Sequence, residues 1–501
     1  MDMQQTESKS NNNSLLPYDF VRETSIIALE ENSGCKIFSQ EKVSVEIYHE
    51  LSRFLNRDFE LEICDSEQFN QLLTKVFSTE NNSGEFSDEL NESFDLKTFA
   101  NSIAPTEDLL SGSDDVPIIK LINGVISQAI KQRVSDIHFE PYENLFIIRY
   151  RIDGILKEVL SQDSRIAPLV ISRIKIISRL DISERRLPQD GRVSLSLGNK
   201  RVDVRVSTLP STYGERIVLR LLDKQSAQIN IQNLGLEKSI LKNYQATLKA
   251  SEGIILVTGP TGSGKTTTLY AGLRYLSDSS QNILTVEDPI EYTLKGVGQT
   301  QVNAKTGYDF AMGLRSMLRQ DPDIVMVGEI RDQETARIAI QASLTGHLVL
   351  STVHTNSAVG AITRLRDMGI EPFLLSSSLK TIISQRLVRR LCNHCKRENQ
   401  LSSNMAKLFN IKKGTAVFEP KGCDHCDGTG YIGRVAVAES IQIDAELKNM
   451  IHEKASEQEI AKYAFQNNLS IDEAGKDLII SGITSAEELI RINNQKDNAS
   501  L

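Results

Sequence analysis

The clearest hydrophobic pattern lies in the second half of the chain, where short apolar runs alternate with amphipathic segments. Four runs, Ile254–Val257, Ile283–Val286, Ile324–Val327 and Leu348–Ser351, each precede a loop rich in polar residues. Short apolar runs between helical segments are typical of buried parallel strands with helices on both faces of the sheet. Such sheets bind ligands at the carboxyl ends of their strands. The pattern therefore predicts an α/β domain whose site lies in these loops.

The first half of the chain predicts two smaller α/β domains. Apolar and amphipathic segments occur between residues 15 and 77, and they resume near Pro117 at helical spacing. The elements that we expect are a strand-like segment at Thr24–Leu29, a helix at Val43–Phe54, strands at Leu145–Ile152 and Val193–Leu197, and a helix at about Ile166–Leu180. Past Arg434 the pattern predicts mostly helix through Ile490, followed by a polar tail.

Charge changes this picture in one segment. The net charge is −9, but residues 79–115 alone carry ten Asp and Glu against one Lys, which is −9. The rest of the chain is therefore neutral, and the acidic segment is expected to be a disordered linker. Global charge neither supports nor excludes a nucleic-acid partner. No apolar run approaches the roughly 18 residues of a membrane helix, and no secretory signal precedes residue 14, so we expect a cytoplasmic chain.

The loop after Ile254–Val257 fits the phosphate-binding pattern, or Walker A motif. Its glycines let backbone N–H groups turn toward the phosphates, and the helix that follows presents its positive end. Lys265 is expected to reach the β and γ phosphates of ATP, and Thr266 to ligate Mg²⁺. The predicted nucleotide-binding residues are Gly259, Pro260, Thr261, Gly262, Ser263, Gly264, Lys265, Thr266 and Thr267.

Two further loops carry carboxylates. Glu287, Asp288 and Glu291 follow the second run, and one of these three carboxylates is expected to position or deprotonate the attacking water. Glu329 follows the third run, with Gly328 where many P-loop enzymes place the aspartate that binds magnesium. We expect Glu329 to hold Mg²⁺ through water or to polarise the nucleophile.

Two histidines and four cysteines complete the candidate chemistry. His347 and His354 bracket the fourth run, and an imidazole near the γ phosphate can sense hydrolysis. The cysteines occur as two Cys-x-x-Cys pairs separated by 27 residues, Lys396 to Gly422, a spacing that favours metal over disulfides in a cytosolic chain. The predicted ligands are Cys392, Cys395, Cys423 and Cys426.

With these elements in this order, the chain resembles the secretion ATPase superfamily of type II secretion, type IV pilus and related motors. The resemblance runs from about Val116 to Ser485. Its motifs are an Asp box at Thr285–Tyr292, a Walker B element at Asp323–Asp332, a His box at Thr345–Asn356, and second-domain signatures at Ser135–Pro141 and Leu187–Gly191.

The resemblance implies that the second domain closes over ATP and that arginines complete the site. Arginine suits this role because its planar fork neutralises charge that develops on the transferred phosphoryl group. The implied arginines are Arg205 and Arg220 of the second domain and Arg315, Arg319 and Arg331 of the domain that binds ATP, with Arg201 and Arg216 as alternatives.

The resemblance also implies a fold and an assembly. We expect an α/β chain with a RecA-like P-loop motor, a PAS-like second domain, an N-terminal docking domain and a tetracysteine zinc module. The expected boundaries are 1–14 disordered, 15–78 docking domain, 79–115 acidic linker, 116–223 second domain, 224–235 linker, 236–391 ATPase domain, 392–426 zinc module, 427–490 helical part and 491–501 tail.

By resemblance, the function is ATP hydrolysis that powers type II secretion by a homo-hexamer attached peripherally to the inner membrane. The implied partners are inner-membrane secretion proteins, namely the cytoplasmic domain of the L component and the platform protein F, with acidic phospholipid as a further candidate. A type IV pilus assembly ATPase is the main alternative. A DNA-translocating motor is less favoured, because the basic run Arg173–Arg186 has no interleaved aromatic residue, and no nucleic acid is expected.

Overall fold

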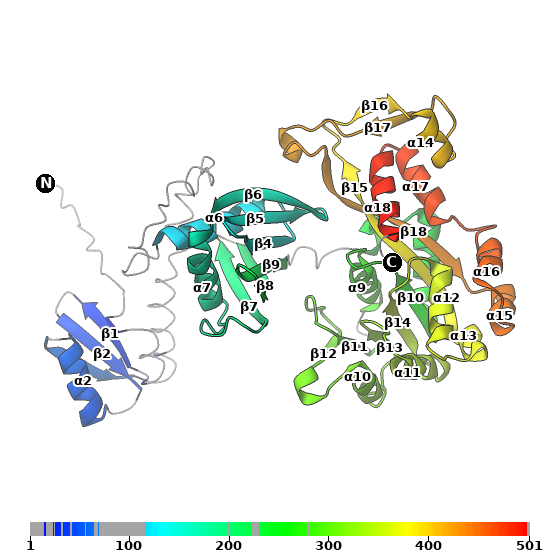
Figure 1. Ribbon diagram of the computed structural model, residues 1–501. Helices are drawn as coiled ribbons and strands as arrows, with labels where there is room; N and C mark the ends of the chain where they lie inside the picture. Colours follow the sequence, from blue (N-terminus) through cyan, green and yellow to red (C-terminus); the bar gives the residue numbers. More distant parts are fainter. Residues whose placement is uncertain are drawn as a thin grey trace, which may run out of the picture. The chain divides into compact units, whose positions relative to one another are not determined.

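The computed structural model describes residues 15–16, 24, 26–31, 34–40, 43–55, 57–64, 69, 116–197, 200–222, 230–278 and 280–497. The chain divides into two compact units (Figure 1). The first contains a three-stranded sheet and most of a six-stranded sheet, and the second is built on a seven-stranded sheet. Within the described residues, no helix is both long and apolar enough to cross a membrane. The predicted disordered start at residues 1–14 and the predicted acidic linker at residues 79–115 lie outside the described residues.

In the described residues, the N-terminal region forms a three-stranded sheet and one helix. Strand β1 pairs antiparallel with β2, and β2 pairs parallel with β3. The paired side chains Ala28 and Ile37 lie on one face of the sheet and are fully buried, and Leu51 of the helix packs in the same core. The elements are β1 (Ile26–Glu31), β2 (Gly34–Ser39), α2 (Val45–Leu55) and β3 (Phe59–Ile63).

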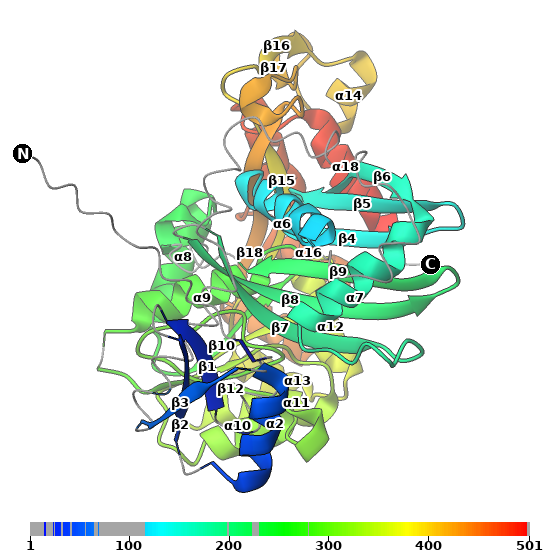
Figure 2. The same ribbon diagram turned by 90° about the vertical axis from the view of Figure 1, so that its left-hand side faces the viewer.

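The six-stranded sheet has the strand order β6-β5-β4-β9-β8-β7. Helices α6 and α7 lie side by side over one of its faces (Figure 2). Alternate residues of the strands, such as Phe146, Ile148 and Tyr150, are buried, as expected when one face is covered. The elements are α6 (Val116–Lys131), β4 (Asp136–Pro141), β5 (Leu145–Ile152), β6 (Ile155–Asp163), α7 (Ala167–Ile177), β7 (Gln189–Leu197), β8 (Lys200–Ser211) and β9 (Gly214–Leu222).

The seven-stranded sheet has the order β12-β11-β13-β14-β10-β15-β18, and only the pairing of β15 with β18 is antiparallel. All four predicted strands are present in it. Its strands are β10 (Gly253–Thr258), β11 (Ile283–Glu287), β12 (Gly298–Gln301), β13 (Ile324–Val327), β14 (Leu348–Val353), β15 (Leu379–Leu391) and β18 (Tyr431–Gln442).

Helices cover both faces of this sheet, which explains why its strands are continuously apolar. Leu256 packs into the core on one face and its neighbour Val257 into the core on the other, because successive strand residues point to opposite faces. The helices are α8 (Lys238–Leu248), α9 (Lys265–Leu276), α10 (Phe310–Met317), α11 (Gln333–Leu344), α12 (Ala358–Asp367), α13 (Pro372–Ser378), α15 (Ala445–His452), α16 (Glu457–Ala464), α17 (Ile471–Ile480) and α18 (Ala486–Asp497).

Two features near the C-terminus differ from the sequence-based expectation. The predicted helical part begins only at Ala445, the first residue of α15, because residues 431–442 form β18 at the edge of the sheet. The supposed tail continues α18 to Asp497, with Ile492 buried. Short apolar runs do not distinguish helix from strand, and the long-range partner β15 decides the outcome for β18.

A small module connects β15 to β18 and contains the four cysteines. It holds a two-stranded antiparallel sheet, in which Arg397 pairs with Glu419 and Gln400 with Ala416. Its elements are β16 (Arg397–Gln400), α14 (Ser403–Leu408) and β17 (Ala416–Glu419). In Figure 1 this module lies beyond the ends of β15 and β18, next to α17 and α18.

Candidate functional site

The predicted phosphate-binding loop links the buried strand β10 to helix α9. Gly259 to Gly264 form the loop, and Lys265, Thr266 and Thr267 are the first residues of α9. Gly259 has a φ of 144°, and a Cβ there would lie 2.3 Å from the backbone oxygen of Gln385, so a side chain is excluded. Because no side chain is present at this position, the loop can pack against β15 and turn its backbone N–H groups outward, as anion binding requires.

Lys265 turns its amine into the phosphate-binding loop. Its Nζ donates to the backbone oxygens of Gly259 at 2.9 Å and of Pro260 at 3.1 Å. Burial lowers the pKa of Lys265, and the negative charge of Glu329 partly offsets this effect. The amine therefore lies where a phosphate can replace its carbonyl partners.

Glu329 and His354 meet at the carboxyl edge of the same sheet. Glu329 follows β13, and His354 follows the neighbouring strand β14. His354 Nε2 lies 3.2 Å from Glu329 Oε2, and Arg331 forms an ion pair with the other carboxylate oxygen. Burial and then the positive charge of Lys265 lower the pKa of His354, although Glu329 acts in the opposite direction. The imidazole is therefore neutral near pH 7.

Glu287 of the Asp box is a buried anchor for the site. It is 3% exposed and accepts hydrogen bonds from Thr285 Oγ1 at 2.6 Å and Gln299 Nε2 at 3.0 Å. The hydroxyl of Tyr270 donates to its other oxygen. These three donors occupy Glu287, so Glu291 at the more open end of the loop is the better candidate for contact with water. No local sequence signal identifies Tyr270 or Gln299, because both are brought in by the fold.

His347 lies at the opposite edge of the sheet from the phosphate-binding loop. Its backbone oxygen accepts a hydrogen bond from Gly253 at the start of β10, whereas the loop follows the end of β10. Strand β14 has six residues, which at about 3.3 Å each separate its two ends by about 20 Å. The ring Nδ1 of His347 lies 2.9 Å from the backbone oxygen of Ala342. Of the two predicted histidines, only His354 therefore belongs to this chain's own site.

The four cysteines form one compact cluster. Their sulfur atoms all lie within 4.8 Å of one another, including 3.9 Å between Cys392 and Cys423, 3.8 Å between Cys395 and Cys426, and 3.7 Å between Cys423 and Cys426. Four thiolates at about 2.3 Å from a tetrahedral zinc ion are about 3.8 Å apart, so the cluster fits this ion. Burial raises the pKa of Cys426, but backbone N–H donors from Cys423 and Gly430 outweigh burial and hold it at about 7.

Comparison with known proteins shows to which family the chain belongs. A family model described as type II/IV secretion system protein matches residues 111–491, and a second model, described as a domain of GSPII protein E, matches residues 15–77. The chain belongs to the type II/IV secretion system protein family. The resemblance noted from the motifs is therefore confirmed.

Three relatives show how far the similarity extends. The type II secretion system protein E of Klebsiella pneumoniae is 48% identical over 484 residues, covering 96% of this chain and 97% of the relative. The type II secretion system ATPase E of Vibrio cholerae is 47% identical over 486 residues, again covering 96% and 97%. The solved structure of the pilus retraction motor PilT with bound ADP has a TM-score of 0.50 and 26% identity, and the match covers 73% of this chain and 95% of that chain.

The arginines that the sequence analysis predicted for the site have defined partners in this chain. In the seven-stranded unit, Arg315 forms an ion pair with Glu334, and Arg319 donates to the backbone oxygen of Arg315 at 3.0 Å. Arg331 pairs with Glu329 and is the one of these three that touches the Glu329–His354 pair. Contact of Arg315 and Arg319 with a nucleotide stays a prediction.

In the six-stranded sheet, acidic residues of β4 position two arginines of β9. Arg220 Nε donates to Asp136 Oδ1 at 2.8 Å, and Arg216 forms an ion pair with the buried Glu140. Arg205 lies half-buried on β8, opposite Arg192. The Ser135–Pro141 signature, found in the sequence without an assigned role, thus supplies the carboxylates that hold these cations. Their contact with ATP stays a prediction.

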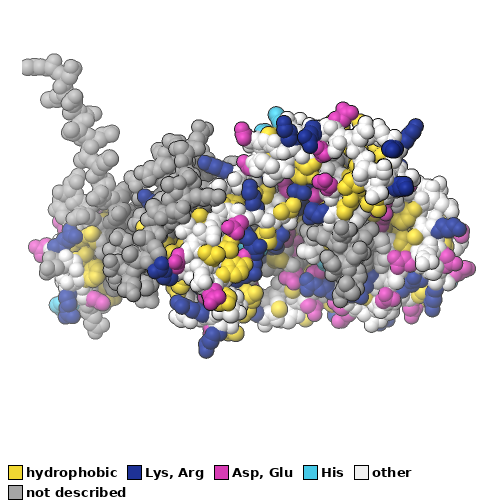
Figure 3. All heavy atoms as spheres, turned by 45° about the horizontal axis from the view of Figure 1, so that its top comes forward, with side chains coloured by type: hydrophobic (Ala, Val, Ile, Leu, Met, Phe, Trp, Pro, Cys, Tyr) yellow, Lys and Arg dark blue, Asp and Glu magenta, His cyan; other side chains and the backbone are white. Residues whose placement is uncertain are grey.

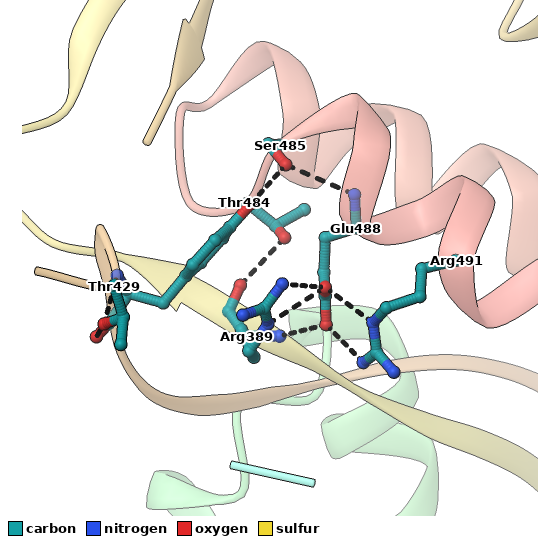
Figure 4. Close-up of polar contacts among 7 residues, drawn as sticks. Arg389, Thr429, Thr484, Ser485, Glu488 and Arg491 are labelled. Carbon is teal, nitrogen blue, oxygen red and sulfur yellow. Dashed lines mark hydrogen bonds and ion pairs between the residues drawn. The ribbon is translucent and has the colours of Figure 1, made fainter. Parts of the chain in front are cut away.

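The base of the cysteine module is held by the C-terminal helix (Figure 4). Glu488 of α18 is fully buried and accepts hydrogen bonds from Arg389 of β15 at 2.8 and 3.0 Å and from Arg491 at 2.7 and 2.9 Å. Tyr431 contacts Ser485 through its hydroxyl at 2.8 Å, and its ring faces the Arg389 guanidinium at 3.9 Å. This cluster joins the strands on both sides of the module to α18.

Proposed function

We propose that this chain is the ATP-hydrolysing motor of a type II secretion system. The observation that carries the proposal is the meeting of Glu329 and His354 beside the Lys265 loop, at the edge where parallel sheets bind their ligands. The relatives named type II secretion system protein E and ATPase E, similar along nearly their full length, support the secretion assignment. The match of residues 15–77 to a domain of GSPII protein E favours it over a pilus assembly ATPase.

Each residue of the site takes a distinct role in this proposal. Lys265 binds the β and γ phosphates, and backbone N–H groups of the loop surround them. Glu329 orients the attacking water, while neutral His354 holds the carboxylate in place. Glu291 is the candidate base, and Glu287 anchors the loop through its three donors. Magnesium, when bound next to Thr266 and Glu329, supplies charge neutralisation for the phosphates.

The arginines complete the site in the closed state. Arg205 and Arg220 are delivered by the second domain, and Arg315, Arg319 and Arg331 by the domain that binds ATP. A guanidinium near the transferred phosphoryl group stabilises its developing charge. The ion pairs of Arg220 with Asp136 and of Arg315 with Glu334 support pre-positioned side chains.

The cysteine module holds a structural zinc ion in this proposal. Four sulfur ligands leave no coordination position open for a substrate. The spacing of the sulfur atoms and the backbone N–H groups that point at Cys426 Sγ, at 3.1 and 3.2 Å, support thiolate ligands.

The motor works as a homo-hexamer in the cytoplasm, bound peripherally to the inner membrane. The GSPII protein E domain match supports docking of residues 15–77 on the cytoplasmic domain of the L component, with the platform protein F and acidic phospholipid as further contacts. A DNA translocase would use a continuous basic stripe. On the face in Figure 3, Lys and Arg side chains are instead interspersed with acidic and apolar ones.

The Lys265→Ala variant tests the proposed function. We expect the rate of ATP hydrolysis to fall by at least about 100-fold, because the β and γ phosphates lose the positive charge of Lys265. The thermal unfolding temperature should be unchanged. The Glu329→Gln variant should keep ATP affinity and lose turnover, because its role falls in the transition state. Steady-state turnover and nucleotide binding measure both. Wild-type turnover of Lys265→Ala would refute the proposed function.

A further inference from the structure

Gln385 lies beside the phosphate-binding loop on the neighbouring strand β15. In the parallel pairing of β10 with β15, Thr258 is opposite Ser384, so Gln385 is level with the first residue of the loop. Its side chain is 1% exposed. A buried amide at this position must have hydrogen-bond partners for its donor and its acceptor.

Both ends of the Gln385 amide contact the nucleotide-binding segment. Nε2 donates to the backbone oxygen of Ser263 at 2.7 Å, and Oε1 accepts from the Thr268 hydroxyl at 2.8 Å. A carbonyl oxygen only accepts, so the nitrogen must face Ser263 and the amide has one possible orientation. The contact therefore fixes the direction of the Ser263 carbonyl.

That direction determines where the next N–H group points. The peptide unit is planar and trans, so the carbonyl of Ser263 and the N–H of Gly264 point in opposite directions. Holding the carbonyl toward β15 turns the Gly264 N–H into the loop, where backbone donors surround the phosphates. The reverse orientation would place a carbonyl oxygen against an anion.

We propose that Gln385 is a positioning residue for phosphate binding, because it locks the Ser263–Gly264 peptide with its N–H group toward the nucleotide. The inference rests on the proposed ATPase function, since it concerns the same loop. A glutamine suits this task because the lock needs a donor for Ser263, and the Thr268 contact needs an acceptor on the same rigid amide. Gln385 touches no phosphate itself and acts through the backbone.

Two substitutions of similar size test this role in the full-length chain. Q385E and Q385M both remove the donor to Ser263, and only the first adds a charge. We expect both to weaken ADP binding by about 10- to 100-fold, because a buried carbonyl left without a donor is costly and its peptide can turn. Adenosine, which has no phosphate, should bind as it does to the wild type. Competition against a fluorescent ADP analogue measures both affinities.

The pH dependence of ADP binding by Q385E provides a second measurement, which a purely structural role of Gln385 would not affect. A protonated carboxyl group regains an O–H donor, and burial raises the pKa of a carboxyl group. The ADP affinity of Q385E relative to the wild type should therefore recover as the pH falls from about 8 to about 6. Q385M should show no recovery over the same range.

Ser384→Ala is the matched control on the same strand. Ser384 is buried, and in the part of the chain that the structure describes its hydroxyl has no hydrogen-bond partner. We expect wild-type ADP affinity from this variant. Wild-type ADP affinity in both Q385E and Q385M, or an equal loss of ADP and adenosine binding, would overturn the inference. Such a result together with an inactive Lys265→Ala variant leaves the ATPase function standing, whereas an active Lys265→Ala variant refutes that function itself.

Discussion

His354 lies between charges of opposite sign. Its Nε2 is 3.2 Å from the carboxylate of Glu329, and Lys265 acts on the same ring. Burial and Lys265 lower the pKa of His354 from 6.5, while Glu329 raises it. Because the folded pKa lies below the unfolded value, the stability that depends on neutral His354 is present above about pH 6.5 and is lost as the pH falls below it.

The two charges should move the pKa of His354 in opposite directions when they are removed. Lys265→Ala should raise the pKa, because a repelling cation is lost, and Glu329→Gln should lower it, because an attracting anion is lost. Titration of the histidine resonances by NMR, assigned with a His354→Gln variant, measures both shifts. His347 lies at the other edge of the sheet, away from both substituted residues, and its resonances serve as the reference signal in the spectra. Shifts of the same sign would contradict this arrangement.

At the scale of elements, Glu488 joins α18 to β15. Its pKa is lowered despite burial, because Arg491 and Arg389 donate to the carboxylate. The stability from this cluster is therefore present above the ordinary glutamate value of 4.5 and is lost as the pH falls through the lowered pKa. The cluster is one of the contacts by which α18 supports the two strands that lead into the cysteine module.

Glu488→Gln should destabilise the fold by about 3 kcal/mol, because two guanidinium groups lose their buried anion. The exposed neighbour Glu487 offers a matched control, and Glu487→Gln should change the free energy of unfolding by less than about 0.5 kcal/mol. Urea denaturation at pH 7 measures both. Equal stability of the two variants would show that the cluster in Figure 4 does not hold α18 in place.

The cysteine module should carry about one zinc ion per chain, because its four thiols form a single site. Chelation should speed hydrogen exchange between Cys392 and Cys426 and leave the exchange of β10 and β14 unchanged, because each Cys-x-x-Cys pair is too short to fold alone. Metal analysis and hydrogen-exchange mass spectrometry test this. Purified protein with reduced cysteines and no zinc would contradict the proposal.

At the scale of the whole molecule, the proposed docking of residues 15–77 predicts how the motor is controlled. The isolated chain should be a weak ATPase, because the closed arrangement that delivers Arg205 and Arg220 is only partly populated. The cytoplasmic domain of the L component should raise the turnover of the full-length chain several-fold and should not affect a variant that begins at Val116. Turnover of both proteins, with and without this domain, gives the comparison. If the L component stimulated the turnover of both proteins equally, the N-terminal domain would not be the element that couples the partner to ATP hydrolysis.

The sequence by itself determined the features whose signal is local. The loop from Gly259 to Thr266, the four buried strands and the two Cys-x-x-Cys pairs were all visible as short patterns, and the structure has each of them. A buried parallel strand must be apolar on both faces, and a phosphate-binding loop needs glycine where side chains would collide. These requirements concern residues that are close together in the chain, so they can be recognised from the amino-acid sequence alone.

The tertiary structure alone decided which residues meet across the sheet. The sequence made both His347 and His354 candidates, with His354 the stronger, and the direction of β14 places only His354 beside Glu329. The sequence left open which carboxylate of the Asp box is the base, and in the structure Tyr270, Thr285 and Gln299 occupy the carboxylate of Glu287. No local signal marked Gln385 as a hydrogen-bond partner of Ser263, and the short apolar run in residues 431–442 did not distinguish a strand from a helix. Strand order and pairing bring these groups together over long separations in the chain, and a local pattern carries no record of its distant partner.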